Sequence, residues 1–593
     1  MNNDIKKEQS SPLNRMLTIL FLFVGIALVY HETLDNPFLW DDVHLIEQNL
    51  FIQNPDNFSK IFTREYFTQP IEISYRPVAT MSYMLNYVLW GNQPAGWHYF
   101  NLAIHLINAM LLFHLACVAL GRPWLATAIS LLFALHPIQT EALNCVTFRD
   151  APMCLLFIML SISLFISASN STNACRRSIS LLLSIVSFII AIFTKETAVV
   201  APALIFAYVY FIRDSKGLIA SFKPCSPYIL VAAAYLIIRF GPMRGPAESY
   251  VFHGGGAAQT FIVMIQAWAG YVSMMIWPAK QCVEHAFSET PGFFEASTLS
   301  AVFTVVAFAA CAAVIMRKNR AAGFGVAWFV LALLPVSNII PIGVVMAERY
   351  LYIAAPGFLL AIAFIIKMFF FSDNNPYPSL SRLFVSLVLI IAIAISGFAT
   401  KNRNRAWDNE VVFWETAQSC APVSAKVLVN LGVAYMNSDR LDDAKRALTL
   451  AVRIASDGSL SDLRYGSLYR AITNLGIVSA REGKFETAIK LLSSSAQLNP
   501  NSEYSYFNLG VVYIRAGMPE QAEAAFKHGL SIQPRNLAAR FYLIGLYHYS
   551  GRIEEAIVEC DNILKLSPDN PRASMLKESL RRESSIIDNS YGN

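Results

Sequence analysis

The sequence predicts an all-α protein in two parts, a polytopic membrane domain followed by a C-terminal α-solenoid. Of its 593 residues, 55% are hydrophobic and 15% are charged, whereas soluble proteins have about 25% charged residues. The apolar stretches end near residue 400, and a recurring motif follows. We therefore expect a membrane domain over 1–401, a connecting segment over 402–423, repeats over 424–570 and a tail over 571–593.

The membrane domain contains about eleven apolar segments that approach the length of about 20 residues needed to cross a bilayer. Residues 16–34 form the first, and no small-residue cleavage site follows, so we interpret it as an uncleaved span. The segment 261–277 is also apolar, but "WPAK" interrupts its end, and we expect it to lie along the outer surface. The other predicted spans are 98–119, 124–137, 151–169, 178–194, 197–212, 227–241, 298–316, 323–341, 351–370 and 382–400.

Basic residues favour this topology, because cytoplasmic loops of membrane proteins are enriched in Lys and Arg. With the N-terminus inside and the repeats outside, the residues on the cytoplasmic side are Lys6, Lys7, Arg15, Arg122, Arg176, Arg177, Arg213, Lys216, "RKNR" (317–320), Lys367 and Arg382. The basic stretch "TKNRNR" (400–405) would lie outside, against the rule.

The same topology places the unusual polar loops on one outer face. They contain Asp41 and Asp42 and the stretches 136–150, 194–197, 242–297 and 341–352. Ionisable residues near bilayer depth usually mark function, so we expect these loops to share one site. Arg149 and Asp150 are expected to form a local ion pair instead.

The repeats have the 34-residue period of tetratricopeptide repeats, each a pair of antiparallel helices. Ala488, Ala522 and Ala556 are spaced by 34 residues, as are Pro500, Pro534 and Pro568. The preceding spacing, from Ala444, is 44 residues, which indicates an insertion near "SDGSLSDLRY". Such superhelices bind extended peptides or partner proteins on a concave face; the alternative is a spacer or an oligomerisation arm.

Other patterns exclude several classes of function. The net charge is +5 without a long Lys/Arg run, so nucleic-acid binding is not expected. The nine cysteines form no C-x-x-C pair and predict neither a zinc site nor a disulfide framework. "HGGGAAQ" (253–259) lacks the Lys of a phosphate-binding loop, so we expect no nucleotide cofactor and interpret this stretch as a flexible lid.

Five motifs occur in a characteristic order before the repeats: "WDD" (40–42), "LFALHPIQTEAL" (132–143), "TKE" (194–196), "LLPVSNIIPIGVVMAERYLYI" (333–353) and "RNRAW" (403–407). With them the chain resembles the transmembrane and tetratricopeptide repeat-containing O-mannosyltransferases and their bacterial relatives, in the GT-C superfamily of glycosyltransferases. The resemblance implies transfer of a sugar from a polyprenyl-phosphate donor outside the cytoplasmic face. It marks Asp41 and Asp42 as the acidic pair and also assigns Glu141, Glu348 and Arg349 to the site.

A carboxylate can take the proton of an acceptor hydroxyl as its oxygen attacks the anomeric carbon. Asp41 is our candidate for this base, and its alternative role is to cap a helix that starts at Val43. Asp42 and Glu141 are candidates for holding the acceptor or, together with Asp41, a divalent cation such as Mg²⁺ or Mn²⁺. His44, His136 and Glu348 are candidate supporting residues.

The leaving lipid phosphate needs a cation in a low-dielectric site. Arg349 is our first candidate, because arginine binds phosphate oxygens bidentately, and Lys195 is the second. The alternative for Arg349 is an ion pair with Glu348 or another acid of the outer loops. Adjacent residues of a helix do not face each other, which weakens the pairing with Glu348.

The sequence thus predicts a glycosyltransferase that moves a hexose such as mannose to an acceptor hydroxyl, expected to be Ser or Thr of a protein bound by the repeats. The alternatives are a glycan or lipid acceptor, or a non-catalytic membrane scaffold. The repeats would lie in the periplasm of a bacterium or in the lumen of the endoplasmic reticulum of a eukaryote. The C-terminal "NSYGN" is no retention signal for that organelle and favours a bacterial source.

Overall fold

A computed structural model describes residues 12–68, 74–213, 217–244, 252–253, 256–278, 281–285, 287, 292–371, 377–456 and 462–591, with only the backbone for 462–465 and 586–591. Throughout these residues the regular structure is helical and contains no strand, which confirms the all-α prediction. Lys6, Lys7, Lys216, two glycines of "HGGGAAQ" and residues 457–461 of the insertion near "SDGSLSDLRY" lie outside the described residues.

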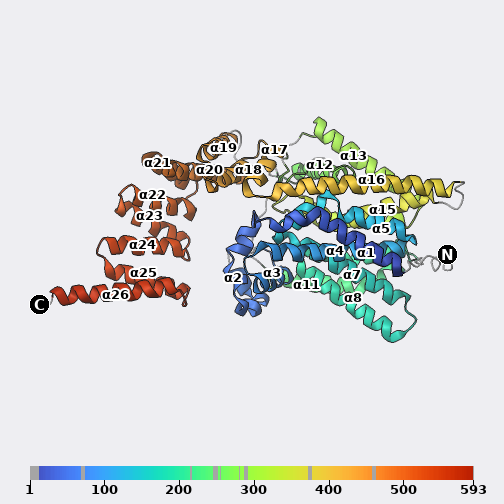
Figure 1. Ribbon diagram of the computed structural model, residues 1–593, viewed down its shortest axis with the longest axis horizontal. Coiled ribbons are helices and arrows are strands. Elements are labelled where there is room, and N and C mark those ends of the chain that lie inside the picture. The colour runs from blue at the N-terminus through green and yellow to red at the C-terminus, as the bar shows by residue number, and fades with distance from the viewer. Residues whose placement is uncertain are drawn as a thin grey trace. The chain divides into compact units, whose positions relative to one another are not determined.

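The chain forms two compact units, Met1–Cys420 and Ala421–Asn593. In the first, long helices pack side by side, and in the second, shorter helices stack in pairs (Figure 1). Most of the connecting segment predicted for 402–423 belongs to the first unit, where α17 (Glu410–Cys420) is its last helix.

In the described residues, nine helical segments are long and apolar enough to cross a membrane. Eight of the eleven predicted spans are among them, and the other three are shorter apolar helices: Pro123–Ala134 (α5), Glu196–Phe211 (η7 and α9) and Ala322–Val336 (α14 and η10). The nine are Pro12–Asp35 (α1 and η1), Pro94–Leu120 (α4), Val146–Asn170 (η6 and α7), Ala174–Thr194 (α8), Leu218–Phe240 (α10, η8 and α11), Ala257–Ile276 (α12), Ala296–Lys318 (α13), Glu348–Phe370 (η11 and α15) and Pro378–Trp407 (α16 and η12). The protein is therefore a membrane protein.

Helix α12 is the ninth segment, although we expected it to lie along the outer surface. Its length and composition do not distinguish it from the spans. Its Trp268 donates to Ser337 Oγ at 3.0 Å, and its Tyr271 Oη accepts from the Ala347 N–H at 3.4 Å. Both partners lie in the segment between α14 and α15, so α12 packs beside this segment.

Two glycines bring α14 (Ala322–Leu333) and α15 (Leu351–Phe370) into close contact. A Cβ on Gly325 would lie 2.6 Å from the Ala361 backbone nitrogen, and one on Gly357 would lie 2.6 Å from that of Phe329. Small residues at such crossings allow the close packing by which membrane helices associate.

The two ends of the membrane helices carry different sets of residues. At the end that we predicted to be cytoplasmic, Lys367 Nζ donates to the Leu120 carbonyl at 2.6 Å, and the Arg122 guanidinium lies 5.0 Å from the centroid of the Phe371 ring. The loops with the predicted site residues gather at the opposite end.

The basic stretch 400–405 is built into that opposite end. Thr400 donates to the Leu135 carbonyl at 2.7 Å, Lys401 pairs with Glu32 at 3.3 Å, and Asn404 donates to the Val29 carbonyl at 3.0 Å. These contacts fasten the stretch to residues at the ends of α1 and α5 and to η1.

The second unit consists of paired helices with the predicted repeat pattern. The glycine of each "NLG" sequence faces the second helix of its pair: a Cβ on Gly432 would lie 2.5 Å from Leu448, and one on Gly510 2.7 Å from Phe526. The helices are α18 (Ala425–Asn437), α19 (Leu441–Ser456), α20 (Asp462–Arg481), α21 (Phe485–Leu498), α22 (Glu503–Arg515), α23 (Pro519–Ile532), α24 (Leu537–Tyr549), α25 (Ile553–Leu566) and α26 (Pro571–Tyr591). The predicted tail is therefore α26, which packs on α25.

Candidate functional site

The "WDD" motif begins with a residue in a strained conformation. Trp40 has a φ of 57°, in the left-handed region that residues other than glycine rarely adopt. Its ring lies against Phe148, Phe413 and Trp414, with centroid distances of 5.3, 5.8 and 6.3 Å. Such strain persists only where surrounding contacts enforce it and is concentrated at functional sites.

The two acids that follow Trp40 have different surroundings. Asp42 is fully buried, and its two carboxylate oxygens accept the backbone N–H groups of Val146 at 2.9 Å and Thr147 at 2.8 Å. Burial raises the pKa of Asp42 to about 6, although these hydrogen bonds act in the opposite direction. Asp42 therefore fastens the first loop to the segment that precedes α7 (Asp150–Asn170).

Asp41 is half-buried and lies within electrostatic range of the Arg349 guanidinium. Asp41 and Asp42 already have helical backbone conformation before the π-helical turn Val43–Glu47, and Asp42 makes no side-chain capping bond to that turn. Of the acidic pair, Asp41 is the less buried member.

Glu141, which is buried, and Arg349, which is partly buried, form an ion pair. The backbone N–H of Arg349 donates to Glu141 Oε2 at 2.8 Å, and its guanidinium binds Oε1 of the same carboxylate. The guanidinium also lies over the Phe148 ring, 4.1 Å from its centroid, and over Trp40 at 5.8 Å. The alternative expected for Arg349, a pair with another acid of the outer loops, is thus what the structure contains.

Glu348 does not pair with Arg349, as we expected for adjacent residues. It is fully buried, its Oε1 accepts the Cys282 backbone N–H, and His285 Nε2 lies 4.0 Å from that oxygen. Its strongest electrostatic interaction is with Arg403, which belongs to the "RNRAW" motif. The sequence analysis missed His285 and Arg403, although the order of the motifs already pointed to "RNRAW".

A disulfide joins Cys282 to Cys420, at a sequence separation of 138 residues. It links the segment beside Glu348 to the end of α17. Our expectation that the cysteines form no disulfide framework is therefore wrong for this pair. The reason is that disulfide partners meet only through the fold, and a lone cysteine in a loop has no pattern that identifies its partner.

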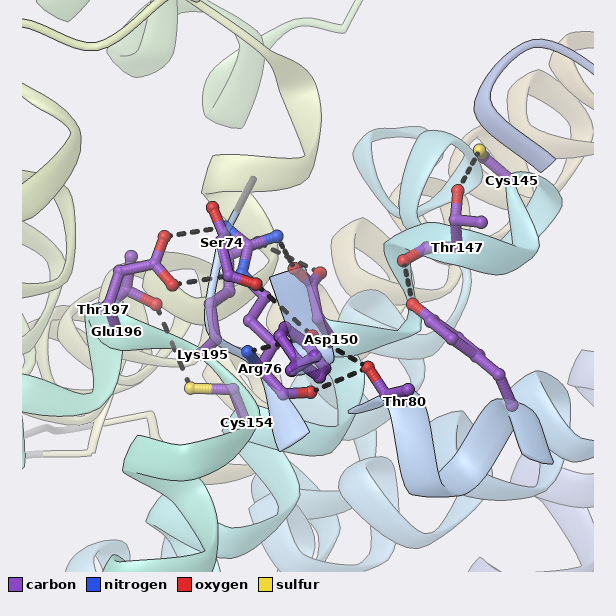
Figure 2. Close-up of polar contacts among 12 residues, drawn as sticks. Ser74, Arg76, Thr80, Cys145, Thr147, Asp150, Cys154, Lys195, Glu196 and Thr197 are labelled. Carbon is purple, nitrogen blue, oxygen red and sulfur yellow. Dashed lines mark hydrogen bonds and ion pairs between the residues drawn. The ribbon is translucent and has the colours of Figure 1, made fainter. Parts of the chain in front are cut away.

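Lys195 belongs to a second charged cluster, drawn in Figure 2. Its Nζ donates to Asp150 Oδ1 at 3.1 Å, and Asp150 Oδ2 accepts from Arg76 Nη1 at 2.7 Å. Arg76 in turn binds Glu196 through two nitrogens, at 3.0 and 2.6 Å. The structure thus places Lys195, a predicted phosphate ligand, in an ion-pair network. Tyr350 lies within electrostatic range of both this network and the Glu141–Arg349 pair.

Arg149 does not pair with Asp150, so the expected local ion pair is wrong. Arg149 is fully buried and donates to Asn86 Oδ1 at 2.9 Å and to the Trp97 carbonyl at 3.2 Å. Its guanidinium also lies over the rings of Tyr83, Trp97 and Phe100. The aromatic and amide neighbours come from distant helices, and this is why the spacing of the two charges was misleading.

The two predicted supporting histidines make local hydrogen bonds. His44 is exposed, and its Nδ1 hydrogen-bonds with Gln48 Oε1 at 3.0 Å. His136 is buried and accepts the Ile138 N–H at 3.3 Å, which caps the turn Pro137–Gln139. Burial lowers the pKa of His136 to about 4, so the ring is neutral at physiological pH.

The predicted metal ligands do not form a metal site. Among the described residues, no three His, Cys, Asp or Glu side chains gather in a way that can hold a metal ion. Both oxygens of Asp42 accept backbone N–H groups, and both oxygens of Glu141 bind Arg349. Mg²⁺ and Mn²⁺ bind through free carboxylate and water oxygens. The set of Asp41, Asp42 and Glu141 therefore does not fit a divalent cation.

Comparison with known proteins connects both units to one group of proteins. Tetratricopeptide-repeat family models match residues 425–457, 479–533 and 515–580. The chain is similar to protein O-mannosyl-transferases. It is 24% identical to protein O-mannosyl-transferase F38B6.6 of Caenorhabditis elegans over 448 residues, which cover 73% of this chain and 62% of that protein.

Two further relatives extend the similarity to most of the chain. Protein O-mannosyl-transferase Tmtc3 of Drosophila melanogaster is 22% identical, over 83% of this chain and 61% of its own length. The human TMTC3 is 22% identical, over 83% of this chain and 57% of its own length. The matched regions thus span less than two thirds of each of these relatives. A crystal structure of MamA covers 27% of this chain and 83% of its own, with 22% identity and a TM-score of 0.23.

Proposed function

We propose that this protein is a membrane glycosyltransferase that moves mannose from a polyprenyl-phosphate donor to a Ser or Thr hydroxyl of a protein. The observation that carries the proposal is the arrangement of Asp41 and Arg349, a half-buried carboxylate within electrostatic range of a partly buried cation. This pair lies at one end of the membrane helices in a chain similar to protein O-mannosyl-transferases.

In this proposal each charged group has a role. Asp41 takes the proton of the acceptor hydroxyl as its oxygen bonds to the anomeric carbon. The bond between that carbon and the phosphate oxygen breaks, and the lipid phosphate leaves with the electron pair. Arg349 stabilises the charge that develops on this phosphate, because a fixed cation acts strongly in a water-poor site. Glu141 and Asp42 position Arg349 and Asp41 and do not act on the substrate themselves.

The disulfide supports a site outside the cytoplasm, because cytosolic thiols are kept reduced whereas the periplasm and the lumen of the endoplasmic reticulum favour disulfides. The site residues are on the same side, since Glu348 bonds to Cys282 itself. The repeats support a protein acceptor, because superhelices of this kind bind extended peptides.

The test is transfer of radiolabelled mannose from polyprenyl phosphate to copurifying proteins by the full-length wild type. Asp41→Asn should lower the rate by about 10²–10⁴-fold. Glu47→Gln, an exposed acid in the same loop, serves as the matched control and should keep full activity. If the label appears only on glycans or lipids, the acceptor is a glycan or a lipid and not a protein. If the wild type transfers no mannose at all, the result favours a non-catalytic scaffold.

A further inference from the structure

Several buried polar atoms around Glu348 have no hydrogen-bond partner within the described residues. They are Oε2 of Glu348, Nε2 of His285, and Nε and Nη2 of Arg403. Buried polar groups in proteins are nearly always hydrogen-bonded, so each exception needs an explanation. Three such residues in one place indicate a ligand that supplies the missing bonds.

These groups belong to one cluster. His285 Nε2 lies 4.0 Å from Glu348 Oε1, beyond hydrogen-bond distance. Arg403 is the strongest electrostatic partner of Glu348 and also acts on His285. The donors and the carboxyl group therefore interact electrostatically without bonding to each other, which leaves each of them able to bond to a ligand.

The fold holds the three residues from separate parts of the chain. Glu348 precedes α15, and its other oxygen is fixed by the Cys282 N–H. His285 follows Cys282, which the disulfide fastens to Cys420. Arg403 lies near the end of α16 (Pro378–Asn404), where the neighbouring Asn404 is bonded to the Val29 carbonyl and to Asn144. Such support keeps the three side chains in position before a ligand binds.

The chemistry of the cluster selects the class of ligand. A phosphate offers only acceptors and cannot donate the hydrogen bond that Glu348 Oε2 lacks. A hydroxyl group both donates and accepts, so one hydroxyl can donate to Glu348 while its oxygen accepts from Arg403 or His285. We propose that Glu348, Arg403 and His285 bind hydroxyl groups of the hexose that the lipid phosphate carries. This inference rests on the proposed function and identifies the residues that recognise its sugar.

The experiment measures binding of two probes to the full-length protein in lipid nanodiscs. Mannosyl polyprenyl phosphate is compared with sugar-free polyprenyl phosphate of the same chain length by the change in tryptophan fluorescence on binding. The wild type should bind the mannosyl lipid about tenfold or more tightly, the effect of hydrogen bonds to charged groups. Arg403→Gln and Glu348→Gln should abolish this preference and keep the affinity for the sugar-free lipid.

Arg405→Gln is the matched control, because Arg405 is exposed in the same motif and should not affect the preference. If Glu348→Gln does not fold, Arg403→Lys and His285→Asn decide, with thermal unfolding as the check of folding. The proposed sugar site is wrong if the wild type binds both lipids equally, or if the Arg403 variants keep the preference for the mannosyl lipid. Either result leaves the proposed function untouched.

Binding of neither lipid overturns the proposed donor as well. Methyl α-mannoside is the third probe. If Arg403→Gln loses affinity for this free sugar while its preference between the lipids is unchanged, the cluster binds an acceptor glycan and the inference about the donor is wrong.

Discussion

Arg349 holds Glu141 by both carboxylate oxygens, through its backbone N–H at 2.8 Å and through its guanidinium. The two residues are 208 positions apart in the sequence. Their pairing fastens the short helix α6 (Thr140–Asn144) to the start of α15 and fixes the cation next to Asp41.

Removing one partner of this pair should destabilise the protein, because it leaves an uncompensated buried charge. We expect Arg349→Met to lower the free energy of unfolding by about 3–5 kcal/mol, measured by thermal denaturation in detergent. The double variant Glu141→Gln/Arg349→Met should recover a large part of this loss. A single variant as stable as the wild type would contradict the pairing.

Asp41 and Asp42 should separate activity from stability. Asp42→Asn loses an acceptor for one of two backbone N–H groups and should cost about 1–3 kcal/mol of unfolding free energy. Asp41→Asn should change stability by less than Asp42→Asn does, because Asp41 is half-buried and Asp42 is fully buried, and it should abolish most of the mannose transfer. The measurements are thermal unfolding and the transfer assay on the same preparations. Equal stability loss in both variants would exclude the different roles of the two acids.

Asp42 should also make stability depend on pH. Burial raises its pKa from 3.8 to about 6, so the folded protein binds this proton more tightly than the unfolded chain. The stabilisation from Asp42 is therefore complete below pH about 4 and is lost as the pH rises through about 6, a change of about 3 kcal/mol. The wild type should lose stability relative to Asp42→Asn between pH 4 and 7 in thermal unfolding. A constant difference in stability between the two proteins over this range would show that the pKa of Asp42 is not raised.

The network of Lys195 should depend on Asp150 more than on Glu196. The Asp150 side chain is 3% exposed and binds both Lys195 and Arg76, whereas Glu196 is 44% exposed. We expect Asp150→Asn to cost about 3–5 kcal/mol of unfolding free energy because it leaves a buried lysine unpaired. Glu196→Gln should cost at most about 1 kcal/mol. The two variants are compared by thermal denaturation, and a larger effect of Glu196→Gln would reverse this order.

The repeat unit offers a matched pair of glycines. A Cβ on Gly510 would lie 2.7 Å from the Phe526 ring, whereas nothing lies within 4 Å of one on Gly545. Gly510→Ala should destabilise the repeats by about 1–3 kcal/mol through overpacking. Gly545→Ala should be neutral or stabilise them by up to about 1 kcal/mol, because alanine favours a helix. Circular dichroism during thermal unfolding measures both, and similar effects at the two positions would contradict the close helix contact.

Local patterns in the sequence predicted the elements of the fold. Ala488, Ala522 and Ala556 recur every 34 residues, once in each helix pair. Apolar length alone identifies most of the membrane helices. The location of the polar loops at one end followed from counting spans. The sequence also singled out Glu141, Arg349 and Lys195 as charged groups in these loops.

The partners of those groups were not predictable, because they depend on tertiary packing. Arg349 meets Glu141 across 208 residues, and Lys195 meets Asp150 across 45. Arg403 was hidden in a basic stretch that we interpreted only in terms of topology. No local pattern around Cys282 or Cys420 predicts a disulfide between residues that are 138 positions apart.

The disulfide also changes the covalent topology of the chain. Between Cys282 and Cys420 the polypeptide is closed into a ring that contains α13, α14, α15, α16 and α17. A single protease cut anywhere within that ring leaves the N-terminal helices and the repeats in one molecule until a thiol reduces the bond. In a periplasm or a secretory lumen, where proteases are abundant and reductants are scarce, a nicked copy would keep its repeats attached.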